Sequence, residues 1–235
     1  MSMGKAIHPR EMGVQVPEFR FRAKDPASAL THFIGLVAAI FATPVLLVHA
    51  SVAGVNLVGM IALSVFMMSM ILLYGASSTY HAFNVNEKVN LRLKKIDHMM
   101  IFVLIAGTYT PFCVLILGGA AGWRLLATVW GIALAGIVLK ACWVTCPKWF
   151  SSVIYIALGW ACVADLPAIY AMSKGPVFGL LLAGGIFYTV GGVIYALKLK
   201  VFNDRCPGFG SHEVFHLFVM AGSACHYAMM LCFLG

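Results

Sequence analysis

The chain has 235 residues, of which 62% are hydrophobic and 10% are charged, and its mean hydropathy is +0.94. Soluble domains carry about a quarter charged residues, so this composition excludes a soluble globular protein and indicates a polytopic membrane protein. The net charge of +8 bears first on orientation in the membrane and does not indicate a nucleic-acid partner. The seven cysteines form neither a paired zinc motif nor the disulfide framework of a secreted domain.

Residues 1–27 are polar and contain five Lys or Arg residues. They lack the compact basic start, the apolar run and the small-residue cleavage site of a signal peptide. We therefore expect a cytosolic polar tail over residues 1–27 and one membrane domain over residues 28–235.

Seven apolar runs follow this tail, and each is long enough to cross about 30 Å of hydrocarbon. Backbone groups in lipid must be hydrogen-bonded internally, so each run predicts a transmembrane helix. The expected fold is an all-α integral membrane bundle of seven helices, with Pro111 and Pro167 kinking the third and fifth. The runs cover approximately residues 29–50, 54–83, 97–118, 122–143, 149–171, 176–198 and 211–234.

Basic residues predict the orientation of this bundle. Fourteen of the sixteen Lys and Arg residues lie in the tail or near the loops on one side, whereas Arg124 and Lys174 lie on the other. Cytoplasmic loops are enriched in Lys and Arg. The N-terminus is therefore expected in the cytoplasm and the C-terminus outside.

Histidines mark the cytoplasmic end of the predicted bundle. His212 and His216 are four residues apart, which places both imidazoles on one face of a helix, where they can bind one metal ion. The alternative is that both histidines bind no metal and face lipid headgroups. His81 ends the second run and Asp97 begins the third, so alternating helix directions bring these residues to the same depth. We expect one polar cluster there, because ionisable residues within membranes are costly and usually functional.

Three imidazoles and one water complete a tetrahedral zinc site with an open catalytic position, and all-imidazole sites suit zinc. Asp97 could hydrogen-bond that water, accept its proton or bind the metal directly. Ser77, one turn before His81, could orient a substrate or an oxyanion. Structural alternatives remain for both residues. Asp97 could pair with Lys94 or Lys95 or cap its helix, and Ser77 could bond to its own helix backbone.

The segment from His212 to His216 also matches H-E-x-x-H, in which the glutamate of a zinc peptidase acts as general base. This motif is short, and its third ligand would have to come from a distant helix. Glu213 could equally face the cytosol.

Three further polar residues lie within the apolar runs. His226 lies about 21 Å beyond His212 on an ideal helix, too far to share its metal, so we expect a packed histidine or one that lines the same cavity. His32 lies at the cytoplasmic level of the first helix and could support the ligands. Asp165 should have a partner inside the bundle.

Motifs across most of the chain resemble the haemolysin III branch of the progestin and adipoQ receptor family, within a superfamily that includes alkaline ceramidases. The resemblance implies a seven-helix bundle with a cytoplasmic N-terminus. It also implies a zinc ion held by His81, His212 and His216, with Asp97 reaching the metal-bound water and Ser77 beside it. The matching motifs are Ser77-x-x-x-His81, Asp97-His98, Ala106-Gly107-Thr108-Tyr109-Thr110-Pro111-Phe112, Gly184-Gly185 through Tyr188, Gly191-Gly192, Tyr195, Phe209-Gly210-Ser211-His212-Glu213-x-Phe215-His216 and Cys225-His226.

Two functions fit these expectations. The first is a zinc-dependent hydrolase in the plasma membrane that cleaves an acyl or amide bond of a lipid. The second is a non-enzymatic membrane-active protein, of haemolysin, pore or membrane-homeostasis type, with structural zinc. Three histidines beside an aspartate favour an open site over a structural site, which four protein ligands usually close. Both hypotheses place the protein in a lipid bilayer.

Overall fold

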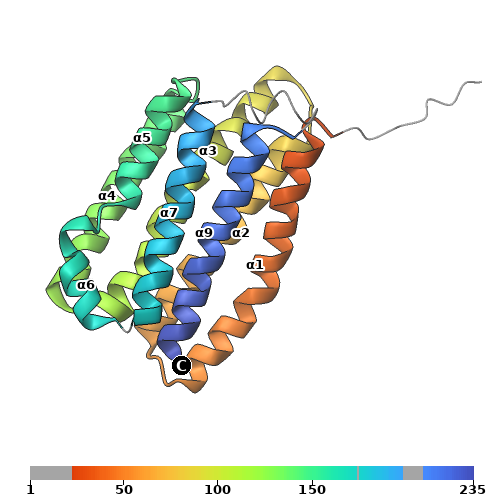
Figure 1. Cartoon of the computed structure of the whole chain (residues 1–235). Coiled ribbons are helices and arrows are strands. Elements are labelled where there is room, and N and C mark those ends of the chain that lie inside the picture. Colours follow the sequence, from red (N-terminus) through yellow and green to blue (C-terminus); the bar gives the residue numbers. More distant parts are fainter. Residues whose placement is uncertain (1–22, 174, 198–208) are drawn as a thin grey trace, which may run out of the picture.

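The computed structural model describes residues 23–173, 175–197 and 209–235. Within these residues seven helical spans are long and apolar enough to cross a membrane, which confirms the predicted seven-helix fold. The spans run alternately up and down the bundle (Figure 1). They consist of α1 (Pro26–Val52), α2 (Leu57–Ala82), α3 (Glu87–Pro111) with the π-helix η2 (Phe112–Leu117), α4 (Gly119–Cys142), α5 (Lys148–Gly159) with the 3₁₀-helix η3 (Val163–Asp165) and α6 (Leu166–Met172), α7 (Gly175–Leu197), and α9 (Ser211–Leu234).

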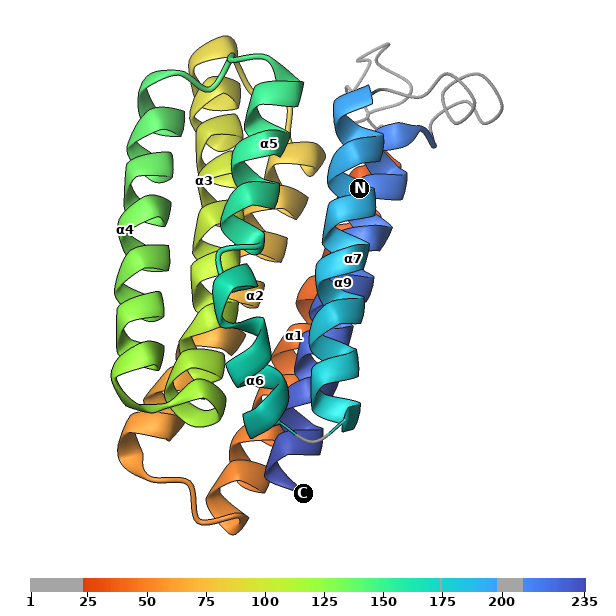
Figure 2. The same cartoon turned by 60° about the vertical axis from the view of Figure 1, so that its left-hand side comes forward.

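The bundle is held together by a chain of helix pairs. α2 packs against both α1 and α3, α4 packs along α3, and α9 packs along both α7 and α1. Figure 2 shows α4, α3 and α5 on one side of the bundle and α7, α9 and α1 on the other. The most buried span is the third, so α3 forms the centre on which the other helices are arranged.

The third helix begins at Glu87, ten residues before the predicted start at residue 97. Asn86 caps it, since its side chain accepts a hydrogen bond from the backbone N–H of Val89 at 2.9 Å. The first turns are rich in Lys, Arg and Glu, which are good helix formers but carry no apolar signal. Hydrophobicity therefore located the part of this helix that crosses lipid but missed its start.

The fifth span is not one kinked helix, so the role predicted for Pro167 is wrong. α5 ends at Gly159 and α6 begins at Leu166, so the break precedes the proline. Pro167 lies in the first turn of α6, where its missing N–H has no intrahelical partner to lose. Pro111 ends α3, and the chain continues as the π-helix η2.

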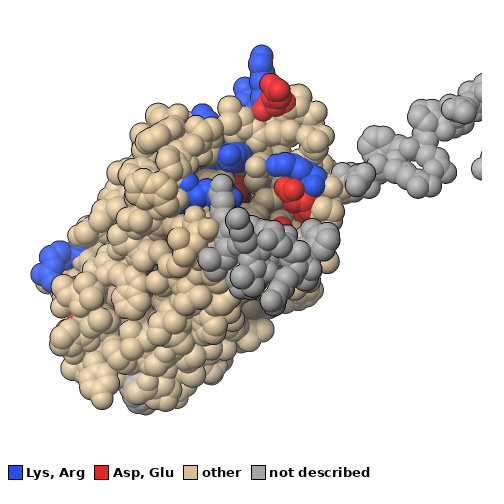
Figure 3. Space-filling view, turned by 45° about the horizontal axis from the view of Figure 1, so that its top comes forward, with Lys and Arg blue, Asp and Glu red and all other residues tan. Residues whose placement is uncertain are grey.

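Charged side chains of the described residues gather at the end of the bundle where α1 and α9 begin (Figure 3). We call this the histidine end, because His81, His212 and His216 lie there. At the opposite end Asp165 has an ion-pair partner, Arg124, at 3.7 Å, but the Arg124 side chain is 70% exposed, so the partner does not lie inside the bundle as expected. The cytoplasmic location of the histidine end stays a prediction of the charge pattern.

Close packing of α4 against the π-helix gives a testable stability prediction. A Cβ atom on Gly122 would lie 2.2 Å from the backbone oxygen of Cys113, whereas one on Gly131 would meet nothing within 4 Å. We expect Gly122→Ala to destabilise the protein by about 1–3 kcal/mol, because backbone must move. The matched variant Gly131→Ala should be neutral or more stable by up to about 1 kcal/mol. Thermal unfolding in detergent checks this, and equal melting temperatures for the two variants would contradict it.

Candidate functional site

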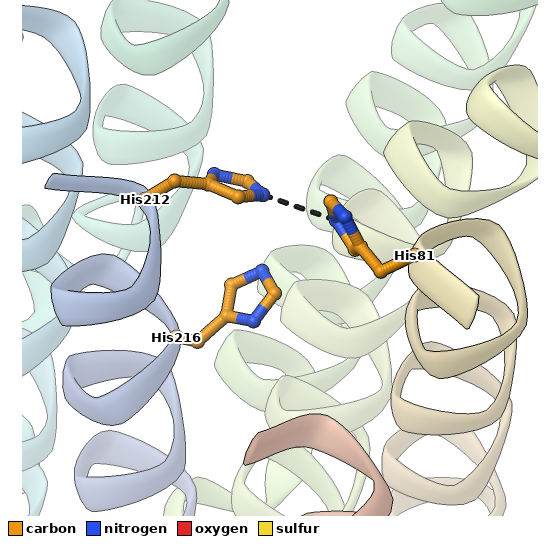
Figure 4. A group of neighbouring side chains, drawn as sticks. All are labelled: His81, His212 and His216. Atoms are coloured by element: carbon orange, nitrogen blue, oxygen red, sulfur yellow. Dashed lines mark hydrogen bonds between the residues drawn. The ribbon is translucent and has the colours of Figure 1, made fainter. Parts of the chain in front are cut away.

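Three histidine side chains meet at the histidine end of the bundle (Figure 4). His81 lies in the last turn of α2, and His212 and His216 lie in the first turns of α9. One nitrogen from each ring can be chosen so that all three lie within 4.8 Å of one another. The Nε2 atoms of His81 and His212 are 3.0 Å apart. The structure thus brings together the three histidines that the sequence predicted as one cluster, although they come from two segments far apart in the chain.

The outer nitrogens of two of these rings have partners on or beside α1. Nδ1 of His81 lies 2.9 Å from a carboxylate oxygen of Asp25, and Nδ1 of His216 lies 3.1 Å from Oγ1 of Thr31. The Thr31 hydroxyl donates its own proton to the carbonyl oxygen of Ser28, so it accepts from His216. In neutral rings both Nδ1 atoms then carry the proton, so each Nε2 has a lone pair that can accept a hydrogen bond, as Nε2 of His81 can from His212, or bind a metal.

Sequence reasoning missed both Asp25 and Thr31. Asp25 directly precedes Pro26 and occupies the N-cap position of α1, yet its side chain makes no capping bond. Its carboxylate faces His81, and its backbone N–H donates to the carbonyl oxygen of His81 at 2.9 Å. An aspartate before a proline at a helix start is typical of a helix cap. The local sequence therefore does not indicate that Asp25 contacts His81.

Glu213 fixes the start of α9. Its carboxylate accepts a hydrogen bond from the backbone N–H of Gly210 at 2.7 Å and another from the Ser28 hydroxyl. Both oxygens are therefore engaged, one in the first turn of α9 and one with α1. These contacts favour a structural role for Glu213 over the general base of an H-E-x-x-H peptidase.

His32 lies against the ring of His216, with centroids 3.6 Å apart and planes within 8° of parallel. It is buried, and neither ring nitrogen has a hydrogen-bond partner among the described residues. His32 therefore lies beside the three histidines, as expected, and it contacts His216 by ring stacking. His212 also has a buried Nδ1 without a partner in the described part of the chain.

A cavity lined by His212, His216 and His32 extends from the histidine end into the bundle. Its lining is mainly apolar and includes both Asp97 and Ser77, which are 7% and 1% exposed. Within the described residues the Ser77 hydroxyl has no hydrogen-bond partner in the protein, unlike the neighbouring Thr79, which bonds to its own helix. The backbone-bonding alternative for Ser77 is therefore not supported.

The structural alternatives for Asp97 also fail. Asn86, not Asp97, caps α3, and Lys95 donates to a backbone oxygen of α4. Nδ1 of His98 lies 3.4 Å from the Asp97 carboxylate and 2.9 Å from the backbone oxygen of Lys94, and no contact of Asp97 with Lys94 or Lys95 is found within the described chain. Asp97 thus lies nearly three turns inside its helix while still lining the cavity beside the histidines.

Comparison with known proteins gives one consistent result. The family model described as "Haemolysin-III related" matches residues 21–227. The chain is 37% identical to Hemolysin-3 of Bacillus cereus over 90% of this chain and 92% of that protein. It is 38% identical to the Hemolysin-3 homolog of Bacillus subtilis (strain 168), over 90% and 93%. A plant protein, Heptahelical transmembrane protein 1 of Arabidopsis thaliana, is 28% identical over 68% of this chain and 52% of its own length.

Proposed function

Because the chain belongs to the haemolysin III related family, we propose that it is a zinc-binding multi-pass membrane protein that hydrolyses acyl or amide bonds of lipids. One observation carries this proposal. Three imidazoles have nitrogens that lie within 4.8 Å of one another, and two of them, His212 and His216, line a largely apolar cavity together with Asp97 and Ser77.

The side chains present fit a zinc ion. Ligands about 2.0–2.1 Å from a tetrahedral zinc lie roughly 3.3–3.4 Å from each other, and the Nε2 atoms of His81 and His212 are 3.0 Å apart. Histidines that bind metals usually donate their other N–H to an oxygen acceptor, most often a carboxylate, a backbone carbonyl or water. Asp25 and Thr31 accept such bonds from His81 and His216. His81, His212 and His216 are therefore the side chains that would hold the ion.

When bound, zinc would polarise the carbonyl group of the lipid and lower the pKa of a water molecule toward neutrality. Asp97 would accept the proton from the attacking water at its carboxylate and then deliver it to the departing amine or alcohol. The Ser77 hydroxyl, which has no protein partner in the described chain, would donate a hydrogen bond to the carbonyl oxygen. The products would be a fatty acid and an amine or an alcohol.

A lipid substrate suits the cavity and its location. The cavity surface is mainly apolar and is contributed chiefly by α3, α5, α7 and α9, which fits a hydrocarbon chain better than a peptide or nucleotide. Charged side chains gather at the histidine end of the bundle (Figure 3), which would place the three histidines at headgroup depth. If that end faces the cytoplasm of a plasma membrane, as the charge pattern predicts, the scissile bond of a lipid would reach the histidines from the inner leaflet.

A second candidate function is favoured by the names of the relatives. Hemolysin-3 of Bacillus cereus carries a name that describes lysis, and a lytic protein could use the same metal to hold α2 and α9 together. In that case the open position of the metal and the free hydroxyl of Ser77 would have no chemical role. The two functions differ in what they do to a pure lipid membrane.

A paired assay separates the two functions. The purified protein, reconstituted in vesicles that contain lipid amides and esters and enclose a dye, is followed for fatty-acid release by mass spectrometry and for dye release by fluorescence. We expect fatty-acid release that stops when the metal is chelated and resumes with zinc, without prompt dye loss. Dye release without hydrolysis would support the lytic function and contradict the hydrolase.

A further inference from the structure

Lys140 is the most buried of the described Lys, Arg, Asp and Glu residues, although it lies in the last turn of α4. It is 1% exposed, and no carboxylate lies within ion-pair distance of it in the described chain. An ammonium group that is buried without a compensating charge is costly. One of its neighbours is therefore expected to supply negative charge.

Two side chains contact this ammonium group. Nζ of Lys140 donates to Sγ of Cys146 at 3.0 Å and to Oγ of Ser151, and the sulfur and this oxygen are 3.2 Å apart. The Ser151 hydroxyl can donate its own proton to the sulfur or to the carbonyl oxygen of Pro147, which is 3.4 Å away. Of these partners only the thiol can become an anion near neutral pH. Cys146 is therefore the side chain that can balance the charge of Lys140.

The environment of Cys146 favours the thiolate over the thiol. Burial by itself would raise the pKa of this thiol. The hydrogen bonds from Ser151 and Lys140, together with the charge of Lys140, outweigh burial and lower the pKa of the Cys146 thiol below its ordinary value. The contacts and the charge thus act in the same direction.

Other titratable groups near the thiol do not compete for this role. α5 and α7 contribute the phenols of Tyr155 and Tyr195, which are uncharged near neutral pH. α3 contributes Lys95, which donates to the backbone oxygen of Ala141. The ammonium group of Lys148, at the start of α5, lies 4.3 Å from the centre of the Tyr195 ring. None of these groups is an acid that could replace the thiol as the partner of the buried ammonium.

Cys146 lies close to the surface of the protein. It belongs to the connection between α4 and α5, outside both membrane spans, at the end of the bundle where α3 begins (Figure 2). Cys146 is 6% exposed, and its neighbours Thr145 and Pro147 are both exposed. Thiolates in electropositive surroundings near a surface are the cysteines that oxidants attack. Limited exposure favours a small oxidant, little larger than water.

We propose that Cys146, held as a thiolate by Lys140 and Ser151, is a site of oxidation by hydrogen peroxide. The sulfur attacks one peroxide oxygen and the O–O bond breaks, so that the cysteine becomes a sulfenic acid and the second oxygen leaves as hydroxide. The sulfur loses two electrons and the peroxide gains them. Ser151 directly precedes Ser152, which lines the main cavity, so the added oxygen would change the contact that fixes α5 beside that cavity. The site needs neither the metal nor the lipid of the proposed function.

Oxidation measured separately at each cysteine tests this inference. The purified full-length protein in mild detergent is exposed to hydrogen peroxide near neutral pH, and catalase then removes the excess. The protein is unfolded with dimedone, which labels sulfenic acids, and peptide mass spectrometry quantifies each site. Cys142 is the internal control, because it is exposed and has no contact with an ammonium group among the described residues. We expect Cys146 to be oxidised at least about tenfold faster than Cys142, despite its lower exposure.

Variants of two lysines show whether the ammonium group is the cause. In Lys140→Met, which removes the charge, oxidation of Cys146 should slow by about 10–100-fold, and a higher pH should restore it, because the thiol then ionises without help. The matched control is Lys95→Met, whose lost ammonium group bonds to a backbone oxygen, and the rate at Cys146 should not change.

Two results would overturn the role of Cys146. One is oxidation of Cys146 that is no faster than that of Cys142 in the wild-type protein. The other is a rate at Cys146 that stays the same in folded Lys140→Met. The comparison of the two cysteines in the wild-type protein decides the question even where a variant does not fold.

Discussion

About one zinc ion per chain is expected in the purified wild-type protein, and almost none when His212 and His216 are both replaced by alanine. Two of the three converging imidazoles are then lost, and one remaining histidine cannot hold zinc through purification. Metal content is measured by plasma mass spectrometry on protein in mild detergent. The matched control is His49→Ala, since His49 lies in the last turn of α1, at the other end of the bundle, and its loss should not change the metal content.

Asp25→Ala provides a graded test of the same site. The carboxylate that accepts from Nδ1 of His81 is removed while all three proposed ligands stay. We expect zinc affinity to fall about 10–100-fold, the usual effect of losing an outer partner of a metal-binding histidine. A folded wild-type protein that contains no metal, or a double histidine variant that keeps its metal, would contradict the proposed site.

Loss of the Asp97 carboxylate should have the largest effect on catalysis with the zinc retained. Asp97→Asn preserves shape but cannot accept the proton, and we expect kcat on the lipid that the wild type hydrolyses to fall about 10²–10⁴-fold. Ser77→Ala removes one hydrogen-bond donor to the carbonyl oxygen and should lower kcat about 10²–10³-fold. Fatty-acid release measured together with zinc content distinguishes a lost catalytic group from a lost metal.

Glu213→Gln is the control that separates this mechanism from a peptidase-type site. Glu213 accepts hydrogen bonds from Gly210 and Ser28, so its replacement should lower the stability by about 1–3 kcal/mol. Turnover by the folded fraction should stay within a few-fold of wild type, as expected for a residue outside the chemistry. Turnover lost in Glu213→Gln but kept in Asp97→Asn would instead make Glu213 the base.

The seven spans and the family could be predicted from the sequence, because both depend on patterns along the chain. An apolar run long enough to cross the hydrocarbon must form a helix, since lipid offers its backbone no other partners. The positions of His81, Asp97 and the pair His212 and His216 also follow from helix direction and spacing. The structure brings the three histidines together and places Asp97 and Ser77 in the adjoining cavity.

Helix ends outside the hydrocarbon were less predictable. The first ten residues of α3 include five charged side chains, and Asn86 caps them, a signal that hydrophobicity does not contain. The fifth span breaks between Gly159 and Leu166 in a stretch that is apolar except for Asp165. Both differences arise because hydrophobicity measures burial in lipid, whereas local hydrogen bonding determines where a helix begins and ends.

The sequence by itself determined a seven-helix membrane protein with three histidines, an aspartate and a serine at one end. Only the tertiary structure decided how these groups are supported. The contacts of Thr31 with His216 and of Ser28 with Glu213 each join residues 185 positions apart, and Asp25 reaches His81 across 56. The unpaired nitrogen of His226 became visible only with its neighbours in place. No local pattern encodes such pairs, because they depend on which helix faces lie together once the bundle has packed.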